Sequence, residues 1–473
     1  MRPRLALLAA ASTLALPTLA GTLTAAHATP VAPGSFSSPN VEWLGNIPDA
    51  AGISAKFITD GGKAKWMYLS TSKGLTIYDV SNPELPLPAG SLPLPNFENE
   101  DIDGNDKLAV ISTSPGGDVY VIDTTNKNLP TLAAHLTTND GDAHTSNCID
   151  ACDRWLYSTE GSYLKAIDLQ QALAGGSDAQ VIHRINFDDY VGAVHDVDQD
   201  ATGIVWMTGG NGGAGYAVHP LTTGVSAALR QRTRNASPLN PVNVTNMIVN
   251  GKNWGRDKSV NDFILHNSKR PSRATYRQTP GASQIEQGGV FLTTEEDYLG
   301  DTGGGAAECS GAGRFHTWDA TGSTATGAPL RKLDTFTLSE GTLDPIKGDR
   351  QVATPFCGAH WFTVQDNIVA IGMYDAGTRF LDVSDPRKIR QVGFFFSADQ
   401  ETWASYWVPG SNIAYSVDLE RGLDILQYKG TPPAGTVYRA PAPVRTKPTF
   451  LRPSPTLGYA CPLVVRAAAA VRR

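Results

Sequence analysis

A short motif recurs along the sequence and constrains the fold more than any other feature. Its copies share an alternating apolar run that ends at an aspartate and leads into a polar turn: GLTIYDVSNP (74–83), DVYVIDTTNK (118–127), YLKAIDLQQA (163–172) and GTRFLDVSDP (377–386). Alternation of this kind is typical of a β-strand with one buried face. Aspartate stabilises turns by accepting hydrogen bonds from backbone amides two residues on. We therefore interpret each copy as a strand followed by a tight turn.

Neighbouring patterns extend each copy to a unit of four strands. A second apolar strand, such as KWMYLST (65–71), and a shorter one precede the copy, and a fourth follows it, as in RKIRQVGFFF (387–396). Repeated four-stranded antiparallel units predict the blades of a β-propeller. The predicted fold is all-β, with seven blades near 53–93, 97–136, 142–186, 193–250, 260–338, 356–396 and 401–430.

The last predicted blade stops without its outer strand. The segment VEWLGNIP at 41–48 resembles the missing piece, so we predict that it completes this blade and closes the ring. Closure would remove the exposed edges of an open sheet. A two-domain β-sandwich is the alternative architecture.

The two ends of the chain differ in composition from the predicted propeller at 29–430. Residues 1–28 have the basic start, apolar run and small residues of a secretory signal peptide. No later segment reaches the roughly 18 apolar residues of a membrane span. Residues 431–473 are proline-rich and basic without an acidic residue, and we predict that they are disordered. We expect a secreted or cell-surface protein, whose tail either associates with an anionic cell wall or is simply solvated.

The charge balance narrows the choice of partners. The net charge is −7 although the tail is basic, so the predicted propeller is more acidic than the whole chain. An acidic surface disfavours nucleic acid as a partner. We expect a monomer without a membrane span that binds a cell-envelope component, an extracellular protein or a small molecule.

The chain contains five cysteines, and export would allow disulfides to form. Cys148 and Cys152 would close a small loop, and Cys309 with Cys357 is a plausible second pair. Cys461 is left over in the tail. Metal binding by the first pair is the alternative, but a second pair at zinc spacing is missing from the sequence.

Four of the nine histidines fall at corresponding places in the predicted innermost strands: His144, His195, His266 and His360. Innermost strands run along the central channel of a propeller, so these side chains are expected to converge on the axis. We interpret the row first as a structural hydrogen-bond network or a water-filled channel. The alternative is a site for one transition metal ion, because neutral imidazoles suit Cu, Zn or Fe, with Glu100, Asp101 and Asp196 as outer-shell groups.

Other polar groups give weaker signals. Ser405 occupies the matching place in the last blade, and the other histidines considered fall on outer strands or loops: His135, His183, His219 and His316. The run Glu295-Glu296-Asp297 could bind Ca²⁺, but a solvent-facing turn is the commoner use of such a run. The chain has no HExxH, GxSxG or GxxxxGK[ST] motif.

The repeats resemble a known family. VYVIDTTN, LTIYDVSNP and TRFLDVSDP are similar to the LVIVD repeat of bacterial surface and secreted proteins, which implies a β-propeller outside the cell but no particular activity. The four histidines give a more distant likeness to the selenium-binding protein and methanethiol oxidase propellers, which implies a histidine-rich metal site. Carotenoid oxygenases also place four histidines around iron on a propeller axis.

The sequence therefore supports two hypotheses of function. The first is a secreted or cell-surface binding module, whose rim is formed by the insertions at 209–260 and 270–288, because function on such scaffolds usually lies in loops. The alternative is a metal-dependent enzyme of oxidase or hydrolase type, with the ion in the central channel.

Overall fold

The computed structural model describes residues 35–438, apart from 49–51, 96–100, 115, 139–142, 161–162, 187–189, 193, 211, 250–251, 254–263, 272–288, 297–312, 339–357, 398–399 and 437. The predicted signal peptide and the tail beyond residue 438 lie outside the described residues, so the predictions made for them remain predictions.

Most of the described chain forms antiparallel sheets, and four of these sheets have four strands each. The first contains β3 (Gly52–Asp60), β4 (Lys63–Thr71), β5 (Gly74–Asp79) and β6 (Leu87–Pro93). The second contains β7 (Asp103–Gly104), β8 (Leu108–Ser112), β9 (Asp118–Asp123) and β10 (Thr131–Thr137). The third contains β11 (Ser146–Ile149), β12 (Trp155–Glu160), β13 (Tyr163–Asp168) and β14 (Ile182–Asn186). The fourth contains β28 (Thr402–Trp407), β29 (Ile413–Asp418), β30 (Gly422–Tyr428) and β2 (Val41–Ile47).

Two further sheets are larger. A five-stranded sheet contains β24 (Phe362–Gln365), β25 (Ile368–Gly372), β26 (Thr378–Asp382), β27 (Arg390–Ser397) and β1 (Ser35–Ser37). A nine-stranded sheet contains β15 (Val194–Gln199), β16 (Ile204–Gly209), β17 (Gly212–Ala217), β18 (Val242–Val249), β19 (Lys252–Asn253), β20 (Ile264–Lys269), β21 (Val290–Glu296), β22 (Phe315–Asp319) and β23 (Leu330–Phe336).

The nine-stranded sheet combines two of the predicted blades. Strands β15 to β18 and β20 to β23 are each antiparallel, and a short parallel pairing of β18 with β23 joins them at Met247–Leu330 and Ile248–Arg331. The short strand β19 adds to β18. The described strands thus form six sheets, and the prediction of seven separate blades is met only in part.

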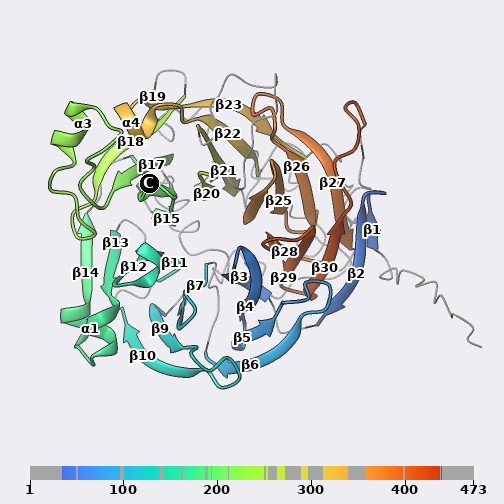
Figure 1. Ribbon diagram of the computed structural model, residues 1–473, viewed down its shortest axis with the longest axis horizontal. Coiled ribbons are helices and arrows are strands. Elements are labelled where there is room, and N and C mark those ends of the chain that lie inside the picture. Colours follow the sequence, from blue (N-terminus) through green and yellow to red (C-terminus); the bar gives the residue numbers. More distant parts are fainter. Residues whose placement is uncertain are drawn as a thin grey trace, which may run out of the picture.

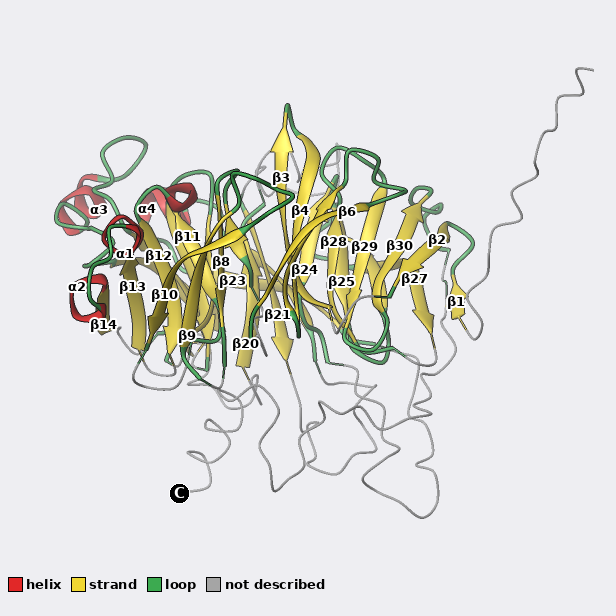
Figure 2. Ribbon diagram, turned by 90° about the horizontal axis from the view of Figure 1, so that it is seen from below, coloured by secondary structure: helices red, strands yellow, loops and turns green. Residues whose placement is uncertain are grey.

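The sheets surround a central axis (Figure 1), and their strands run along it (Figure 2). Strands β3, β7, β11, β15, β20 and β28 lie nearest the centre, while β6, β10, β14 and β27 lie at the periphery. The N-terminal strand β2 pairs with β30, from Val41–Tyr428 to Ile47–Leu423. This confirms the predicted role of 41–48 as the missing strand of the last unit. The strand β1, which pairs with β27, was not predicted.

The repeated aspartates form the turns that the sequence predicts. Oδ1 of Asp79 accepts a hydrogen bond from the Ser81 amide at 2.9 Å, and Asp382 accepts one from Ser384 at 2.9 Å. Asp168 instead caps the N-terminus of α1 (Leu169–Leu173), where its Oδ1 accepts hydrogen bonds from the backbone amides of Gln170 and Gln171. An aspartate at the end of the third strand therefore fixes the direction in which the chain leaves the sheet.

Apolar side chains fill the space between neighbouring sheets. One cluster joins Phe315 of β22 to Phe362 and Leu381 of the next sheet, and another joins Met67 of β4 to Tyr415 of β29. The remaining helices are short and lie in connections: α2 (Asp178–Val181), α3 (Ala227–Arg232), α4 (Ser323–Thr326) and a 3₁₀ turn at Asp150–Cys152. Among the described residues, no helix is both long and apolar enough to cross a membrane.

Candidate functional site

The structure brings the four histidines of the predicted innermost strands together at the axis. Nε2 of His144 lies 3.1 Å from Nε2 of His195. The ring of His195 lies 4.1 Å from that of His266, measured between centroids, and the ring of His266 lies 3.9 Å from that of His360. All four side chains are buried. They form a continuous row of imidazoles contributed by four successive groups of strands.

The carboxylate of Glu296, which the sequence predicts in a solvent-facing turn, lies beside this row of imidazoles. Glu296 Oε2 lies 3.7 Å from Nε2 of His266, and its Oε1 lies 3.7 Å from Nε2 of His360. Tyr374 donates a short hydrogen bond to Oε1 of the same carboxylate. One ring nitrogen of His195, one ring nitrogen of His266 and one oxygen of Glu296 lie within 4.8 Å of one another. We call His144, His195, His266, His360 and Glu296 the axial cluster.

The prediction of a solvent-facing turn at Glu295-Glu296-Asp297 is wrong for its first two residues. Both glutamates belong to β21 and are buried. The strand continues past its apolar part because the Glu295 amide still donates to the carbonyl of Arg314. Asp297 lies outside the described residues. The available signal was that Glu296 ends the second strand of its unit, which pairs with the inner strand that carries His266.

Backbone carbonyls fix the orientation of two imidazoles. Nδ1 of His360 lies 2.7 Å from the carbonyl oxygen of Trp403, and Nδ1 of His195 lies 3.1 Å from that of His266. A carbonyl oxygen only accepts, so each Nδ1 carries a proton, and in the neutral ring Nε2 then holds a lone pair. These lone pairs point into the axial cluster, toward Glu296 and His144 respectively.

Aromatic rings close the cluster on one side. The ring of His360 lies 4.9 Å from that of Trp403, and the ring of His266 lies 6.3 Å from that of Trp361. The sequence predicts Ser405 at the position of β28 that corresponds to the four histidines. In the structure, Trp403 is the residue of β28 that contacts the row of imidazoles. A bulge between Thr402 and Ala404 shifts the register of β28, and Ser405 bonds to Thr378 instead.

Three of the remaining histidines lie where the sequence predicts. His135 is on β10, His183 is on β14 and His219 follows β17. His316 differs, because it is fully buried on β22 with Nε2 3.4 Å from Glu295 Oε2. Burial lowers the pKa of His316, and Glu295 opposes that effect.

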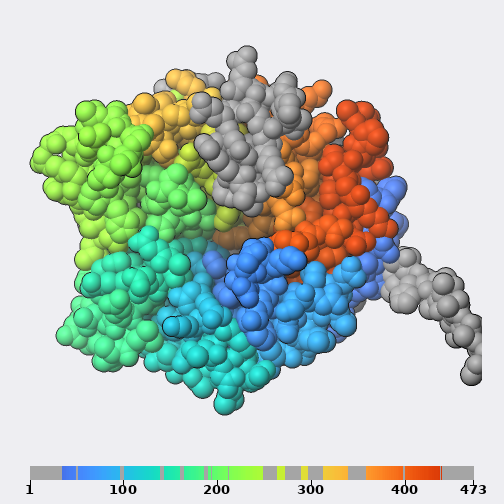
Figure 3. Space-filling model, viewed as in Figure 1, coloured from blue at the N-terminus to red at the C-terminus, as the bar shows by residue number. Residues whose placement is uncertain are grey.

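A cavity of about 1090 Å³ opens beside the axial cluster. Asp196, Asn267 and Trp361 line it, and each directly follows a histidine of the row. We call this space the axial cavity. Figure 3 shows the central hollow on the face from which the β3–β4 hairpin (blue) projects. The cavity therefore lies on the same axis as the imidazoles, one residue further along the inner strands.

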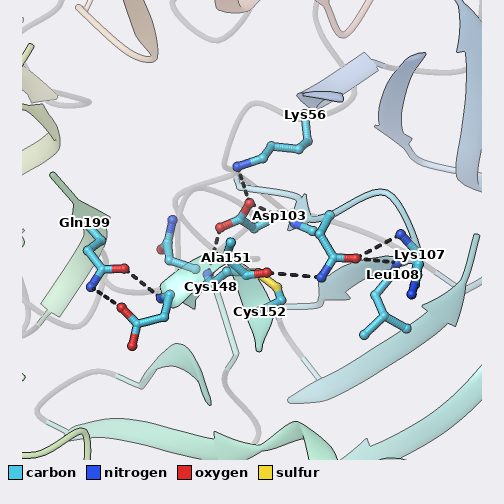
Figure 4. Close-up of a disulfide and its surroundings, with 12 residues drawn as sticks. Lys56, Asp103, Lys107, Leu108, Cys148, Ala151, Cys152 and Gln199 are labelled. Atoms are coloured by element: carbon cyan, nitrogen blue, oxygen red, sulfur yellow. Dashed lines mark hydrogen bonds and ion pairs between the residues drawn. A yellow bond between two sulfur atoms is a disulfide. The ribbon is translucent and has the colours of Figure 1, made fainter. Parts of the chain in front are cut away.

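Ion pairs line the axial cavity. Lys56 contacts Asp103, whose other oxygen accepts from the Cys148 amide at 2.7 Å (Figure 4). Lys269 Nζ lies 2.6 Å from Asp198 Oδ1. A third pair of the lining joins Arg270 to Asp200 at 2.8 Å. The lysine and arginine side chains are thus engaged by carboxylates.

Two carboxyl groups of the cavity were predicted as outer-shell groups of a metal. Burial, reinforced by Asp198, raises the pKa of Asp196 to about 7. Burial, together with Asp103 and Asp196, raises the pKa of Asp101 well above its usual range. Both residues line the axial cavity, while the third predicted group, Glu100, lies outside the described residues.

The predicted disulfide between Cys148 and Cys152 is present (Figure 4), and its first cysteine directly follows Asn147, which lines the axial cavity. Cys309, Cys357 and Cys461 lie outside the described residues. Of the predicted rim, the described part of 209–260 contains α3 and β18, whereas 270–288 is described only at Arg270 and Pro271, which line the cavity.

Comparisons with known proteins support the class of the fold. No family model matches the chain, and no curated protein matches it. Among solved structures, it is similar to the Cps50 (Swd1) β-propeller domain of Myceliophteria thermophila, with a TM-score of 0.51 and 11% identity over 82% of this chain and 99% of that one. Together with the sheets arranged about an axis, this likeness defines the chain as a β-propeller. At such low identity it carries the fold alone, and the resemblance to LVIVD repeat proteins stays a prediction.

Proposed function

We propose that this chain is an exported, metal-dependent β-propeller protein whose axial cluster holds one transition metal ion. His144, His195, His266, His360 and Glu296 would be the ligands. Neutral imidazoles with one carboxylate suit Cu, Zn or Fe. Export would depend on residues 1–28. The propeller would have seven blades, counting the nine-stranded sheet as two, and would act as a monomer.

The orientation of His360 is the observation that carries this proposal. Its Nδ1–H is held by the Trp403 carbonyl, so a neutral ring directs the Nε2 lone pair at the Glu296 carboxylate 3.7 Å away. A lone pair and a carboxylate repel each other unless a cation, either a proton or a metal ion, shares the site. A backbone carbonyl that holds the far N–H is also how proteins orient metal-binding histidines.

The axial cavity would bring a substrate close to this ion. A bound metal would supply Lewis-acid or redox chemistry of oxidase or hydrolase type. The chain's own residues would shape the approach: Trp361 and Asn267 line the cavity beside the histidines, and Asp196 provides a carboxyl group that can hold or release a proton near neutral pH.

Binding of a partner without catalysis is the second candidate. The observation in its favour is the packing of Trp361 and Trp403 against the histidine rings, which separates the axial cluster from solvent on that side. In that case the chain would be a secreted or cell-surface module for an extracellular protein, a small molecule or a cell-envelope component, and the basic tail could contribute contacts to the cell wall.

Elemental analysis of the protein, purified without chelator, tests the metal proposal. We expect close to one Cu, Zn or Fe per wild-type chain and a loss of at least tenfold in a His195→Ala/His360→Ala double variant. The matched control is His183→Ala, because this histidine is half-buried on the outer strand β14, with its ring 5.9 Å from that of Trp155.

Circular dichroism must show that all three proteins are folded. A wild-type chain that stays free of metal after incubation with Cu²⁺, Zn²⁺ and Fe²⁺ would contradict the proposal and favour the binding module. Equal metal content in the double variant and in the control would place the ion outside the axial cluster.

A further inference from the structure

Three buried oxygens that line the axial cavity have no hydrogen-bond partner among the described residues. They are Oδ1 of Asn147, Oδ1 of Asp196 and Oγ of Ser268, in side chains that are 7%, 1% and 0% exposed. The three residues belong to the consecutive inner strands β11, β15 and β20. A buried polar group without a partner costs about 1–3 kcal/mol. Two of these atoms only accept hydrogen bonds, so a ligand that satisfies them must be a donor.

The charges of the cavity favour a positively charged donor. Asp103, Asp198 and Asp200 are paired with Lys56, Lys269 and Arg270. Asp101 and Asp196 are two further buried carboxyl groups of the lining, and Asp366 is an exposed one. Asp101 accepts from the Asn147 side-chain amide, and Asp196 accepts from the Ser268 backbone amide at 3.0 Å. A cation that enters the cavity would be attracted to these carboxylate oxygens.

The other wall of the cavity is aromatic. Phe57, Trp361 and Tyr406 line it together with Trp407. Aromatic faces attract cations and pack against methylene chains. The axial cavity therefore combines unsatisfied acceptors on one wall with apolar rings on another.

We propose that the axial cavity binds a primary amine, with its ammonium group at Asn147, Asp196 and Ser268 and its alkyl stem along the aromatic wall. An ammonium group carries three donors and no acceptor, which matches three unsatisfied oxygens. The proposal goes beyond the metal site and does not depend on an ion in the axial cluster. The amine could be a free small molecule or the lysine side chain of a peptide.

Isothermal titration calorimetry with the full mature chain tests this inference. The probes are n-pentylamine, 1-pentanol as its neutral analogue, and a blocked Gly-Lys-Gly tripeptide. We expect the amine to bind at least tenfold more tightly than the alcohol at pH 8. The Asp196→Asn variant should bind it at least tenfold more weakly than wild type, because the anionic acceptor is lost. The control Asp153→Asn removes the same charge at an exposed position and should not change the affinity.

Each outcome either tests whether an amine binds or shows whether that amine is a free molecule or a peptide lysine. Tighter binding of n-pentylamine than of the tripeptide indicates a free amine, and the reverse indicates a peptide lysine. Equal binding of the amine and the alcohol would overturn the proposal, as would an unchanged affinity in Asp196→Asn. If that variant does not fold, Ser268→Ala removes one acceptor and should weaken amine binding severalfold, and an unchanged affinity in Ser268→Ala would be equally decisive against the proposal.

Discussion

At the scale of single residues, two acids show how position decides chemistry. Asp196 and Asp153 have the same side chain, but Asp196 is 1% exposed beside Asp198, whereas Asp153 is exposed directly after the disulfide loop. Burial disfavours the charged carboxylate, and the hydrogen bond from the Ser268 amide compensates only in part. Asp196 is therefore an acid that can exchange a proton near neutral pH.

The raised pKa of Asp196 predicts how stability depends on pH. The folded state holds this proton up to about pH 7, and the unfolded state releases it near 3.8. The free energy of unfolding should therefore fall as pH rises from about 4 to 7, and Asp196→Asn should remove up to about 4 kcal/mol of that fall. Urea unfolding at pH 4.5 and pH 8 measures the difference, with Asp153→Asn as the control. Identical pH profiles for Asp196→Asn and wild type would contradict it.

At the scale of elements, local pattern predicts strands well and register poorly. Apolar alternation and the turn aspartates are local signals, so the strands of each unit and the closing strand β2 could be predicted from the sequence. Trp403 of β28, and not the predicted Ser405, lies beside the histidines because a bulge in β28 shifts its register. Glu296 was missed because a glutamate run resembles a turn unless its strand pairing is known. The parallel pairing of β18 with β23 joins strands far apart in the sequence, so no local sequence pattern predicts it.

The two N-terminal strands should differ in their effect on stability. Trp43 of β2 is half-buried and donates to Asp424 Oδ1 at 2.8 Å, whereas Phe36 of β1 is 46% exposed and stacks on Phe396. We expect Trp43→Ala to cost about 2–3 kcal/mol and Phe36→Ala less than about 1 kcal/mol. Thermal or urea unfolding of both variants compares them. An equal or larger cost at Phe36 would show that β1, and not β2, holds the ends together.

At the scale of the whole molecule, the axial cluster depends on the ring. His144 and His360 are far apart in the sequence and reach the axis because each lies just ahead of the inner strand of its unit, β11 and β24. The repeat predicts that these four histidines are equivalent, and the structure brings them together. The repeat could not predict which second-strand residues reach inward, so Glu296 and Tyr374 were found only in three dimensions.

A ligand held jointly by several sheets should stabilise the whole ring. Any ion that binds only the folded state raises the free energy of unfolding by an amount that grows with its concentration relative to Kd, about 2.7 kcal/mol at a hundredfold excess. We expect Cu²⁺ or Zn²⁺ to raise the Tm of the chelator-treated chain by several degrees while circular dichroism stays unchanged, because the sheets are held by their own apolar contacts. His183→Ala should respond like wild type, and His195→Ala/His360→Ala should not respond. A similar rise in the double variant would mean that the ions act elsewhere on the surface, and the imidazole row would then be only a structural link between the sheets.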